Sequence, residues 1–440
     1  MRMERREFLS AAALAAVFAK GASARAAEGG GGVAVGEPML QQPGDTTMAI
    51  AWGVTQLAYG AVEVSEDATF AKLRRFVCSR GYGVPDCDDV ALQALVTGLK
   101  PDTSYFYRTV TTPVLSYPNA YGIVTGAPLV GRIHSFRTIG RSGESRFAVI
   151  NDTHGVWAPF DRVANKVLEL KPPFCVWNGD ATNSSETKRE AARPFFDPEI
   201  GRKDYASDIP FAFVYGNHDY RGKFAPHMHE LIMDRPVSER SPEDAALGHN
   251  FAIRQGEIAV LGLDTGEDKT DDHPQMMGYA AYDQHREAQA LWLERTLRRP
   301  DIASAPFVVA CCHIPLYDRN PNAPDGSPKF RRESDGHYFG GHFQRRCMEL
   351  WGPLFTRHGV QVLVAAHEHR YRYDAPAADR PWAQVVGGAP CLGEYGGKPL
   401  PNEYPTVIEC EVRDGRLRIR VHDVWRNRLA GEFAYAPRKI

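Results

Sequence analysis

The residues of this 440-residue chain best suited to chemistry are carboxylate, amide and imidazole side chains that recur in short motifs. They are Asp152, His154, Asp180, Asn217, His313, His367 and His369. Oxygen and nitrogen donors of these kinds bind zinc, manganese or iron, whereas a soft-metal site would use cysteine thiolates. The set is too large for one tetrahedral ion. Because a carboxylate can bridge two cations, we expect two divalent metal ions about 3.5 to 4 Å apart, an arrangement that recurs in phosphoester hydrolysis.

Each motif follows an apolar run that predicts a buried strand. The runs are residues 147–150, 174–177, 211–215, 307–312 and 360–366, and they lead to Asp152, Asp180, Asn217, His313 and His367. In a sheet of strand–helix–strand units the carboxyl ends of the strands open onto one crevice, so we expect the motifs to converge. Taken singly, each has an ordinary alternative, such as a helix N-cap for Asp152 or a core histidine for His313. It is the ordered set that is specific.

In order, the motifs Asp-x-His, Gly-Asp, Gly-Asn-His-Asp, His and His-x-His resemble those of the calcineurin-like metallophosphoesterases, over residues 143–440. The resemblance implies one metal on Asp152, His154, Asp180 and His369, and a second on Asp180, Asn217, His313 and His367. Asp180 would be the bridge. It also implies that His218 contacts a phosphoryl oxygen and serves as proton donor to the leaving group. We expect Asp219, the next residue, to orient the His218 ring. Ala366 stands where the family usually has a glycine, which predicts a slightly altered turn.

The chemistry expected of such a centre is attack on phosphorus by a hydroxide that bridges the two cations. Cations lower the pKa of bound water from about 15.7 toward about 7, so a nucleophile exists at ordinary pH. We expect a metal-dependent phosphoric ester hydrolase of small phosphate esters, with a phosphomonoesterase favoured. A phosphodiesterase or nucleotidase is the alternative, and a non-catalytic secreted binding protein is a third possibility.

Upstream, residues 33–139 predict a different module. Met48, Ile50 and Trp52 alternate, and glycine, proline and aspartate punctuate the stretch, which is typical of short antiparallel strands in an all-β sandwich. Residues 99–105 resemble the corner motif of fibronectin type III domains, in which the Tyr105 hydroxyl would bond to nearby backbone, and Trp52 would be the buried core indole. Such a module before a metallophosphoesterase domain resembles the purple acid phosphatase architecture. The expected fold is thus an all-β fibronectin III-like sandwich followed by an α/β (four-layer α+β) sandwich of two mixed sheets flanked by helices.

The site departs from the purple acid phosphatases in its chemistry. Asn183 stands three residues after Asp180, where those enzymes carry a tyrosine, and His154 is a histidine that they lack. Because phenolate stabilises ferric iron, its absence favours two divalent ions (iron, zinc or manganese) over a mixed-valence iron pair. Asn183 itself has two interpretations, a contact to His218 or the substrate, and a loop amide that caps the next helix.

Residues 1–26 predict a twin-arginine export signal. Arg5 and Arg6 precede an apolar run over residues 9–19 that is too short to span a bilayer, and a small-residue cleavage site follows. A periplasmic or secreted protein is therefore expected. The remaining chain has 47 basic and 52 acidic side chains and no basic stripe. That balance favours a small phosphorylated substrate and argues against long nucleic acid as a partner. The oligomeric state stays open.

Three further features bear on the fold and the site. Residues 160–168 and 283–299 carry apolar side chains at helical spacing and predict covering helices. The polar stretch 316–346, which contains Arg331 and His337, is either a substrate lid or a solvated insertion. Cys78 and Cys87 either close a small disulfide loop or remain thiols.

Overall fold

The computed structural model describes residues 33–79, 84–197, 204–236, 240–317, 342–389 and 403–439. The predicted export signal and residues 318–341 of the polar stretch, with Arg331 and His337, lie outside this range. Both interpretations of that stretch therefore stay predictions. Within the described residues, no helix is both long enough and apolar enough to cross a membrane.

Two sheets carry the predicted motifs. The first has nine strands in the order β22 (Arg428–Tyr435), β21 (Arg416–Asp423), β20 (Thr406–Arg413), β11 (Arg146–Ile150), β12 (Cys175–Asn178), β13 (Phe211–Val214), β1 (Met39–Gln41), β2 (Met48–Gly53) and β6 (Ala91–Val96). The second has six, in the order β14 (Phe251–Gln255), β15 (Ile258–Leu263), β16 (Phe307–Cys312), β17 (Val362–Ala365), β19 (Ala383–Val386) and β18 (Arg372–Asp374). Both sheets are mixed, as predicted.

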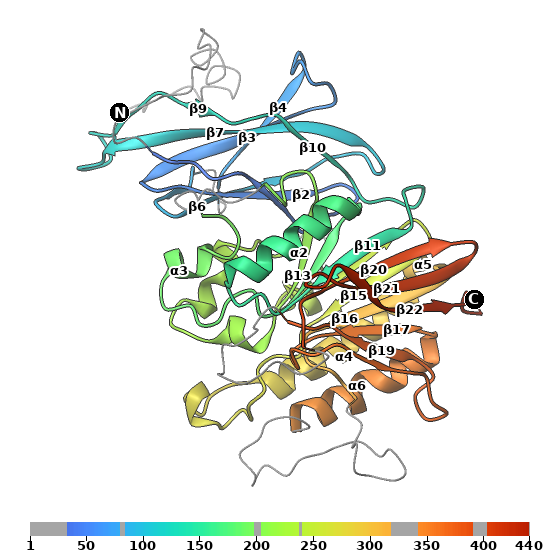
Figure 1. The fold of residues 1–440 in the computed structure, drawn as a ribbon. Helices are drawn as coiled ribbons and strands as arrows, with labels where there is room; N and C mark the ends of the chain where they lie inside the picture. The colour runs from blue at the N-terminus through green and yellow to red at the C-terminus, as the bar shows by residue number, and fades with distance from the viewer. Residues whose placement is uncertain are drawn as a thin grey trace, which may run out of the picture. The chain divides into compact units, whose positions relative to one another are not determined.

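The two sheets pack face to face. Their shared core includes Phe147 and Val176 from the first sheet and Val260, Val309 and Val364 from the second. The outer face of the first sheet is covered by α2 (Trp157–Leu170) and α3 (Lys188–Ala192), and that of the second by α4 (Tyr282–Arg298) and α6 (His342–His358) (Figure 1). This confirms the four-layer fold class and both predicted covering helices, α2 and α4. The remaining helical turns are α5 (Pro300–Ala303), η1 (Asn217–Tyr220), η2 (Ala225–Glu230), η4 (Pro242–Asp244) and η5 (Pro274–Met276).

Strand direction decides where the motifs meet. In the first sheet β11, β12 and β13 run parallel, and in the second β15, β16, β17 and β19 run parallel. Their carboxyl ends therefore lie at one edge of each sheet. Because the sheets are stacked, five turns that follow β11, β12, β13, β16 and β17 can contribute to one site.

The all-β part lies on the N-terminal side of the chain. A seven-stranded sheet comprises β10 (His134–Arg137), β7 (Ser104–Ser116), β3 (Ala58–Ser65) and β4 (Leu73–Val77), with β5 (Cys87–Asp88) on β3 and β8 (Val124–Thr125) and β9 (Leu129–Val130) on β7. It packs against β2 and β6, and the core between them holds Met48, Ile50 and Trp52. Trp52 is fully buried, as predicted, and its indole N–H donates to the Thr111 hydroxyl at 2.9 Å.

The corner motif behaves as expected. The backbone N–H of Lys100 donates to the Tyr105 hydroxyl at 2.9 Å, which confirms the predicted contact. Membership of the fibronectin type III class stays a prediction, since many all-β sandwiches share such features.

The all-β part joins the first sheet directly. β1 pairs in parallel with β13, with Gln41 opposite Phe211, so β1, β2 and β6 extend the sheet that carries the metal-site motifs. Every residue of β2 is buried: Trp52 and Ile50 face the all-β core, and Ala51 belongs to the core beneath α2. The two faces of β2 therefore pack against two different cores, and the alternation of large and small residues reflects the space in each. Neither face of the strand is exposed to solvent. The predicted boundary between residues 139 and 143 stays a prediction.

The cysteines of the described residues are thiols. Cys78 is buried and Cys87 is exposed, and both are free. The structure therefore supports two thiols at these positions and not the small disulfide loop. Cys175, Cys311, Cys312 and Cys410 are buried in strands, where burial raises their thiol pKa values.

Candidate metal centre

The backbone is strained where the expected ligands sit. Asp152, His154, Asp180, His367 and His369 all have positive φ, between 45° and 69°. A non-glycine residue in this region costs free energy and is uncommon, and such residues cluster at functional sites. The strain turns each side chain back from a strand end toward the same point. Ala366, by contrast, is not among the residues with positive φ. Alanine can therefore replace the usual glycine of the family at this turn without backbone strain.

Two glycines allow the strand ends to approach. A Cβ on Gly179 would lie 2.2 Å from Nδ1 of His313, and one on Gly216 would lie 2.2 Å from a carboxylate oxygen of Asp180. Gly179 also has a φ of 84°. The glycines of the Gly-Asp and Gly-Asn-His-Asp motifs therefore make room for ligands from neighbouring strands.

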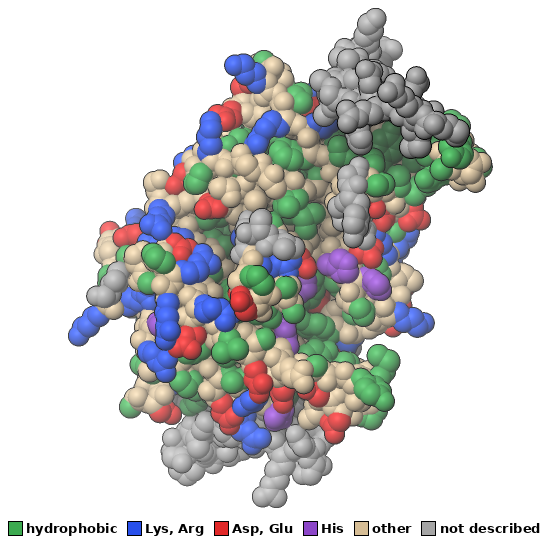
Figure 2. Space-filling view, turned by 180° about the vertical axis from the view of Figure 1, so that it is seen from behind, with side chains coloured by type: hydrophobic (Ala, Val, Ile, Leu, Met, Phe, Trp, Pro, Cys, Tyr) green, Lys and Arg blue, Asp and Glu red, His purple; other side chains and the backbone are tan. Residues whose placement is uncertain are grey.

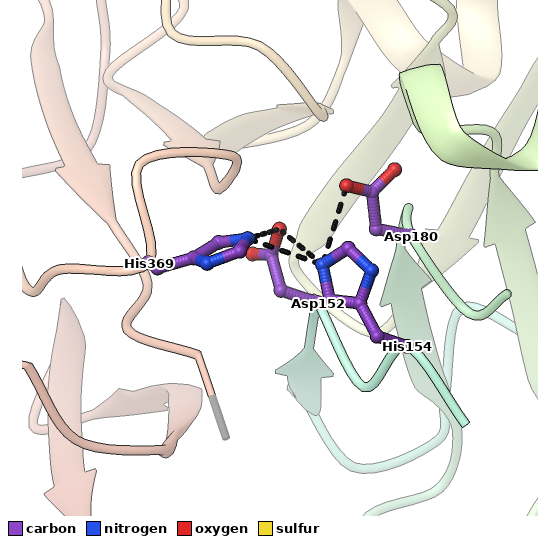
Figure 3. Close-up of side chains that lie close together, drawn as sticks. All are labelled: Asp152, His154, Asp180 and His369. Carbon is purple, nitrogen blue, oxygen red and sulfur yellow. Dashed lines mark hydrogen bonds and ion pairs between the residues drawn. The ribbon is translucent and has the colours of Figure 1, made fainter. Parts of the chain in front are cut away.

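The first group of ligand atoms comes from three turns (Figure 3). Nε2 of His154 lies 3.1 Å from Nε2 of His369 and 3.5 Å from Oδ2 of Asp180, and Nε2 of His369 lies 3.4 Å from Oδ1 of Asp152. The four side chains can together surround one ion. Two imidazole nitrogens and two carboxylate oxygens suit a borderline divalent cation.

The second group shares Asp180. Nε2 of His313 lies 3.2 Å from Oδ2 of Asp180, and the ligand atoms of His313, His367 and Asp180 all lie within 4.8 Å of one another. Oδ1 of Asn217 lies 2.9 Å from Nδ1 of His367, so the amide completes this group. The structure thus brings together all seven expected ligands, with Asp180 common to both groups.

Unsatisfied polar atoms indicate that the centre fits cations. Oδ1 of Asp152, Oδ2 of Asp180 and Nε2 of His313 are buried, face one another and have no partner in hydrogen-bond geometry. An unpartnered buried polar atom costs about 1 to 3 kcal/mol, more if charged. The remaining atoms of these side chains are engaged: Oδ2 of Asp152 accepts from the Asn151 amide at 2.7 Å and from the backbone N–H of His367 at 3.1 Å. The ligand atoms that have no hydrogen bond therefore face a common point, where divalent ions would bind them.

Electrostatics set the protonation of these ligands. Burial lowers the pKa of His154 to about 4 and that of His367 to about 3, so both imidazoles are neutral. Burial also acts on His313, but the carboxylates of Asp180 and Asp152 outweigh it and raise its pKa to about 10. Burial alone would raise the pKa of each carboxyl, yet the charge of His313 holds the pKa of Asp152 below its ordinary value and that of Asp180 well below it.

His218 lies beside the first group. Its ring centroid is 4.7 Å from that of His154, and its backbone N–H donates to Oδ1 of Asp180 at 2.9 Å. Nδ1 of His218 lies 2.8 Å from the backbone carbonyl of Asn183. This contact uses the backbone carbonyl, so a contact of the Asn183 amide with His218 or the substrate stays a prediction. The alternative, that the amide caps the next helix, is wrong, because Thr187 caps α3 with its side chain.

Asp219 has a role other than the expected one. Its carboxylate accepts from the backbone N–H groups of Asp180, Gly216 and Thr182 at 2.9 to 3.0 Å, and from the Thr182 hydroxyl at 2.9 Å. Burial and the charge of Asp180 raise its pKa to about 6. The prediction that Asp219 orients the His218 ring is wrong: Asp219 ties the Asp180 turn to the Gly216 turn, and Asn183 orients the ring. A buried carboxylate is drawn to several backbone donors in preference to one imidazole edge.

Two supporting residues escaped the sequence analysis. Asn178, at the end of β12, accepts from Nδ1 of His313 with its backbone carbonyl at 2.9 Å and donates from its side chain to the carbonyls of Cys312 and Val364. It thereby joins the first sheet to the second directly behind the ligands. Arg221 donates to Nε2 of His218 at 2.8 Å. A signal existed for Arg221: in a 3₁₀ turn residues i and i+3 eclipse, and Arg221 follows His218 by three.

The centre is open to solvent on one side. The His369 side chain is 22% exposed and that of Asp152 is fully buried, so the imidazole forms the outer edge of the first group. Histidine side chains, in purple, reach the surface along a furrow on the face shown in Figure 2.

Comparisons with known proteins identify the family of this chain. The calcineurin-like phosphoesterase family model matches residues 145–371. An uncharacterized protein of Mycobacterium tuberculosis is 25% identical over 300 residues, which cover 64% of this chain and 50% of that protein, and purple acid phosphatase 15 of Arabidopsis thaliana is 23% identical over 305 residues, which cover 63% and 48%. The chain spans about half the length of these curated relatives.

A solved purple acid phosphatase from yellow lupin seeds shares the fold. It aligns with a TM-score of 0.59 and 13% identity over 92% of this chain and 74% of that chain. This chain thus has the two-sheet fold of a metallophosphoesterase, with a cluster of candidate metal ligands at the strand ends. The chain belongs to the calcineurin-like phosphoesterase family.

Proposed function

We propose that this protein is a dinuclear metal-dependent hydrolase of small phosphate esters, and that phosphate monoesters are its preferred substrates. The observation that carries the proposal is the position of Asp180, whose carboxylate belongs to both groups of ligand atoms. The family supports phosphoester chemistry, and the phosphatase named among the relatives supports the monoester.

The residues would divide between two divalent ions. Asp152, His154, Asp180 and His369 would hold one, and Asp180, Asn217, His313 and His367 the other. When bound, such cations lower the pKa of a water molecule and offset the charge of the phosphoryl oxygens. Iron, zinc and manganese suit these donors. Asn183, in place of a tyrosine, offers no phenolate, which favours two divalent ions over a ferric one.

His218 is the side chain we assign to the leaving group. Its Nδ1 is held by the Asn183 carbonyl, so Nε2 is the ring atom that can face a substrate. As the P–O bond breaks, a proton can pass from Nε2 to the departing oxygen, which would otherwise leave as an alkoxide. Asp219 contributes by fixing the turns of Asp180 and Gly216.

The place of action is also a proposal. The twin-arginine pattern of residues 1–26 supports export to the periplasm or the exterior, with a small phosphorylated molecule as substrate. Replacing Arg5 and Arg6 by lysine should leave the protein in the cytoplasmic fraction. Unchanged export would contradict this route.

Metal analysis and two ester assays test the proposed function. The purified protein should contain about two divalent ions per chain and should hydrolyse p-nitrophenyl phosphate faster than bis-p-nitrophenyl phosphate. A chelator should abolish both activities, and added metal should restore them. Asn217→Ala should lower metal content and turnover, whereas Asn119→Ala, in an exposed turn, should change neither.

Two outcomes would contradict the proposal. Metal-loaded protein that hydrolyses neither ester would favour the binding-protein interpretation. Faster turnover of the diester would retain the dinuclear centre but make the protein a phosphodiesterase.

A further inference from the structure

Arg221 is placed at the metal centre by two carboxylates from a distant loop. Its Nε and Nη2 donate to the two carboxylate oxygens of Glu267 at 2.9 and 2.8 Å, and Nη2 donates to Asp268 at 3.2 Å. Glu267 is fully buried and Asp268 nearly so. A two-point grip of this kind fixes the plane of the guanidinium. Nε and Nη2 of Arg221 thus both donate to the carboxylates of this loop, and Nη1 points in another direction.

Nη1 points at the ring nitrogen assigned to the leaving group. It lies 2.8 Å from Nε2 of His218 and 3.3 Å from Nδ1 of the same ring. Nδ1 of the same ring also faces the Asn183 carbonyl, which can only accept, so Nδ1 carries hydrogen and donates to that carbonyl. Arg221 therefore lies against the His218 ring, beside the nitrogen that we assign to the leaving group.

The charges around Arg221 are balanced in the absence of substrate. Lys269 pairs with Asp268 and lies 3.6 Å from Glu267, so two cations face two carboxylates. Such a cluster does not repel an incoming anion, and it supplies a fixed donor at 18% side-chain exposure. A fixed, partly desolvated N–H donor is well suited to an anionic phosphoryl oxygen.

We propose that Arg221 is a substrate-binding residue that selects phosphate monoesters over diesters. In this inference, which rests on the proposed function, Nη1 exchanges its hydrogen bond to Nε2 of His218 for one to a phosphoryl oxygen. Nε2 is then free to take a proton from water and to pass it to the leaving oxygen as the P–O bond breaks. A monoester dianion presents an additional charged oxygen that a diester lacks, and Nη1 binds that oxygen. Glu267 and Asp268 are the positioning residues that hold Arg221.

Replacing Arg221 tests this assignment. In Arg221→Gln the kcat/KM for p-nitrophenyl phosphate should fall about 10- to 100-fold, mainly through a higher KM, because a hydrogen bond to a charged group is lost. The kcat/KM for bis-p-nitrophenyl phosphate should fall less than about threefold. Calorimetric titration of the metal-loaded protein with inorganic phosphate should show a Kd raised about tenfold. Metal content should not change.

Lys223→Gln is the matched control. Lys223 lies two residues further on, its side chain is 89% exposed, and its ion pair with Glu186 is 3.9 Å long. The substitution removes the same charge from the same turn region without touching His218, so kcat/KM and the phosphate Kd should stay at the wild-type values. If Arg221→Gln does not fold, Arg221→Lys is measured instead, with the same direction of change expected because a lysine cannot grip Glu267 and reach His218 together.

The outcomes separate this inference from the proposed function. Equal losses for both esters, or an unchanged phosphate Kd, would overturn the assignment and leave Arg221 a structural link to the Glu267 loop. A wild-type protein that hydrolyses neither ester would overturn the proposed function instead. The phosphate titration would then still decide whether Arg221 binds the anion.

Discussion

Two buried side chains of the all-β core and two carboxylates of the metal centre differ in whether their polar atoms have a hydrogen-bond partner. In the all-β core, Trp52 donates to Thr111, and the Tyr105 hydroxyl accepts from Lys100. At the centre, Oδ1 of Asp152 and Oδ2 of Asp180 remain without a hydrogen bond. The first region satisfies these groups within the chain, which stabilises the fold. In the second region these carboxylate oxygens have no hydrogen-bond partner, and their residues adopt a strained backbone conformation. Both features lower stability but prepare a binding site.

The largest difference between the two regions should appear on removal of one carboxylate from each. Asp180→Asn should lose at least one cation and more than about 1,000-fold in kcat/KM, since the shared ligand serves both groups. Glu66→Gln removes an exposed carboxylate that pairs with Lys100 in the all-β part and should retain both metal and activity. Elemental analysis and ester hydrolysis measure the two effects. Normal metal content in Asp180→Asn would contradict the assignment of Asp180 as the ligand shared by both ions.

The reverse experiment removes packing from the all-β core. Trp52→Ala should destabilise the protein by about 3 to 5 kcal/mol, because it empties a fully buried site and leaves the Thr111 hydroxyl without its partner. Below the melting temperature, metal content should stay normal. Trp425→Ala, at a tryptophan that is 43% exposed and packs against Arg162, should cost less than about 1 kcal/mol. Denaturant unfolding and elemental analysis check both variants; loss of metal from Trp52→Ala would mean that the two regions are not separable.

A smaller effect should follow pH. Burial raises the pKa of Glu63 in the all-β part, but hydrogen bonds from Arg75 and Arg108 outweigh it and hold the pKa below the ordinary 4.5. A carboxyl with a depressed folded pKa stabilises the fold above its unfolded pKa, and this contribution is lost as the pH falls through the folded value. Glu63→Gln should therefore lower stability at pH 7 by about 1 kcal/mol.

The gap between wild type and Glu63→Gln should narrow as the pH falls below the ordinary pKa of 4.5 and toward the lower folded pKa of Glu63. Melting temperatures at pH 7 and pH 3.5 measure it, with Glu66→Gln as the exposed control. A gap that stays constant between these pH values would show that packing, not charge, accounts for Glu63.

Local features were predictable because they depend on neighbouring residues. Apolar runs ending in Asp152, Asp180 and His313 predicted buried strands with polar tips, and the strands are there. The helical spacing of residues 283–299 predicted α4. The Tyr105 corner is likewise local, since its hydroxyl reaches a backbone N–H five residues away.

The role of Asp219 could not be predicted from its position beside His218. In the sequence it adjoins the imidazole, and orientation of that ring was the expected function. In the fold, three backbone N–H groups surround the carboxylate, two of them from the turn after β12. Those donors come from a strand about 40 residues earlier, and only the parallel pairing of β12 with β13 brings them there.

The sequence alone determined the identity and order of the seven residues that we propose as ligands, because donor chemistry and the strand ends that carry it are encoded in contiguous residues. Tertiary structure decided which atoms of those ligands stay open, how Asn178 joins the two sheets behind them, and that Arg221 is held against His218 by Glu267. Those contacts join residues separated by up to 186 positions. Their formation depends on sheet register and packing, which only the complete fold specifies.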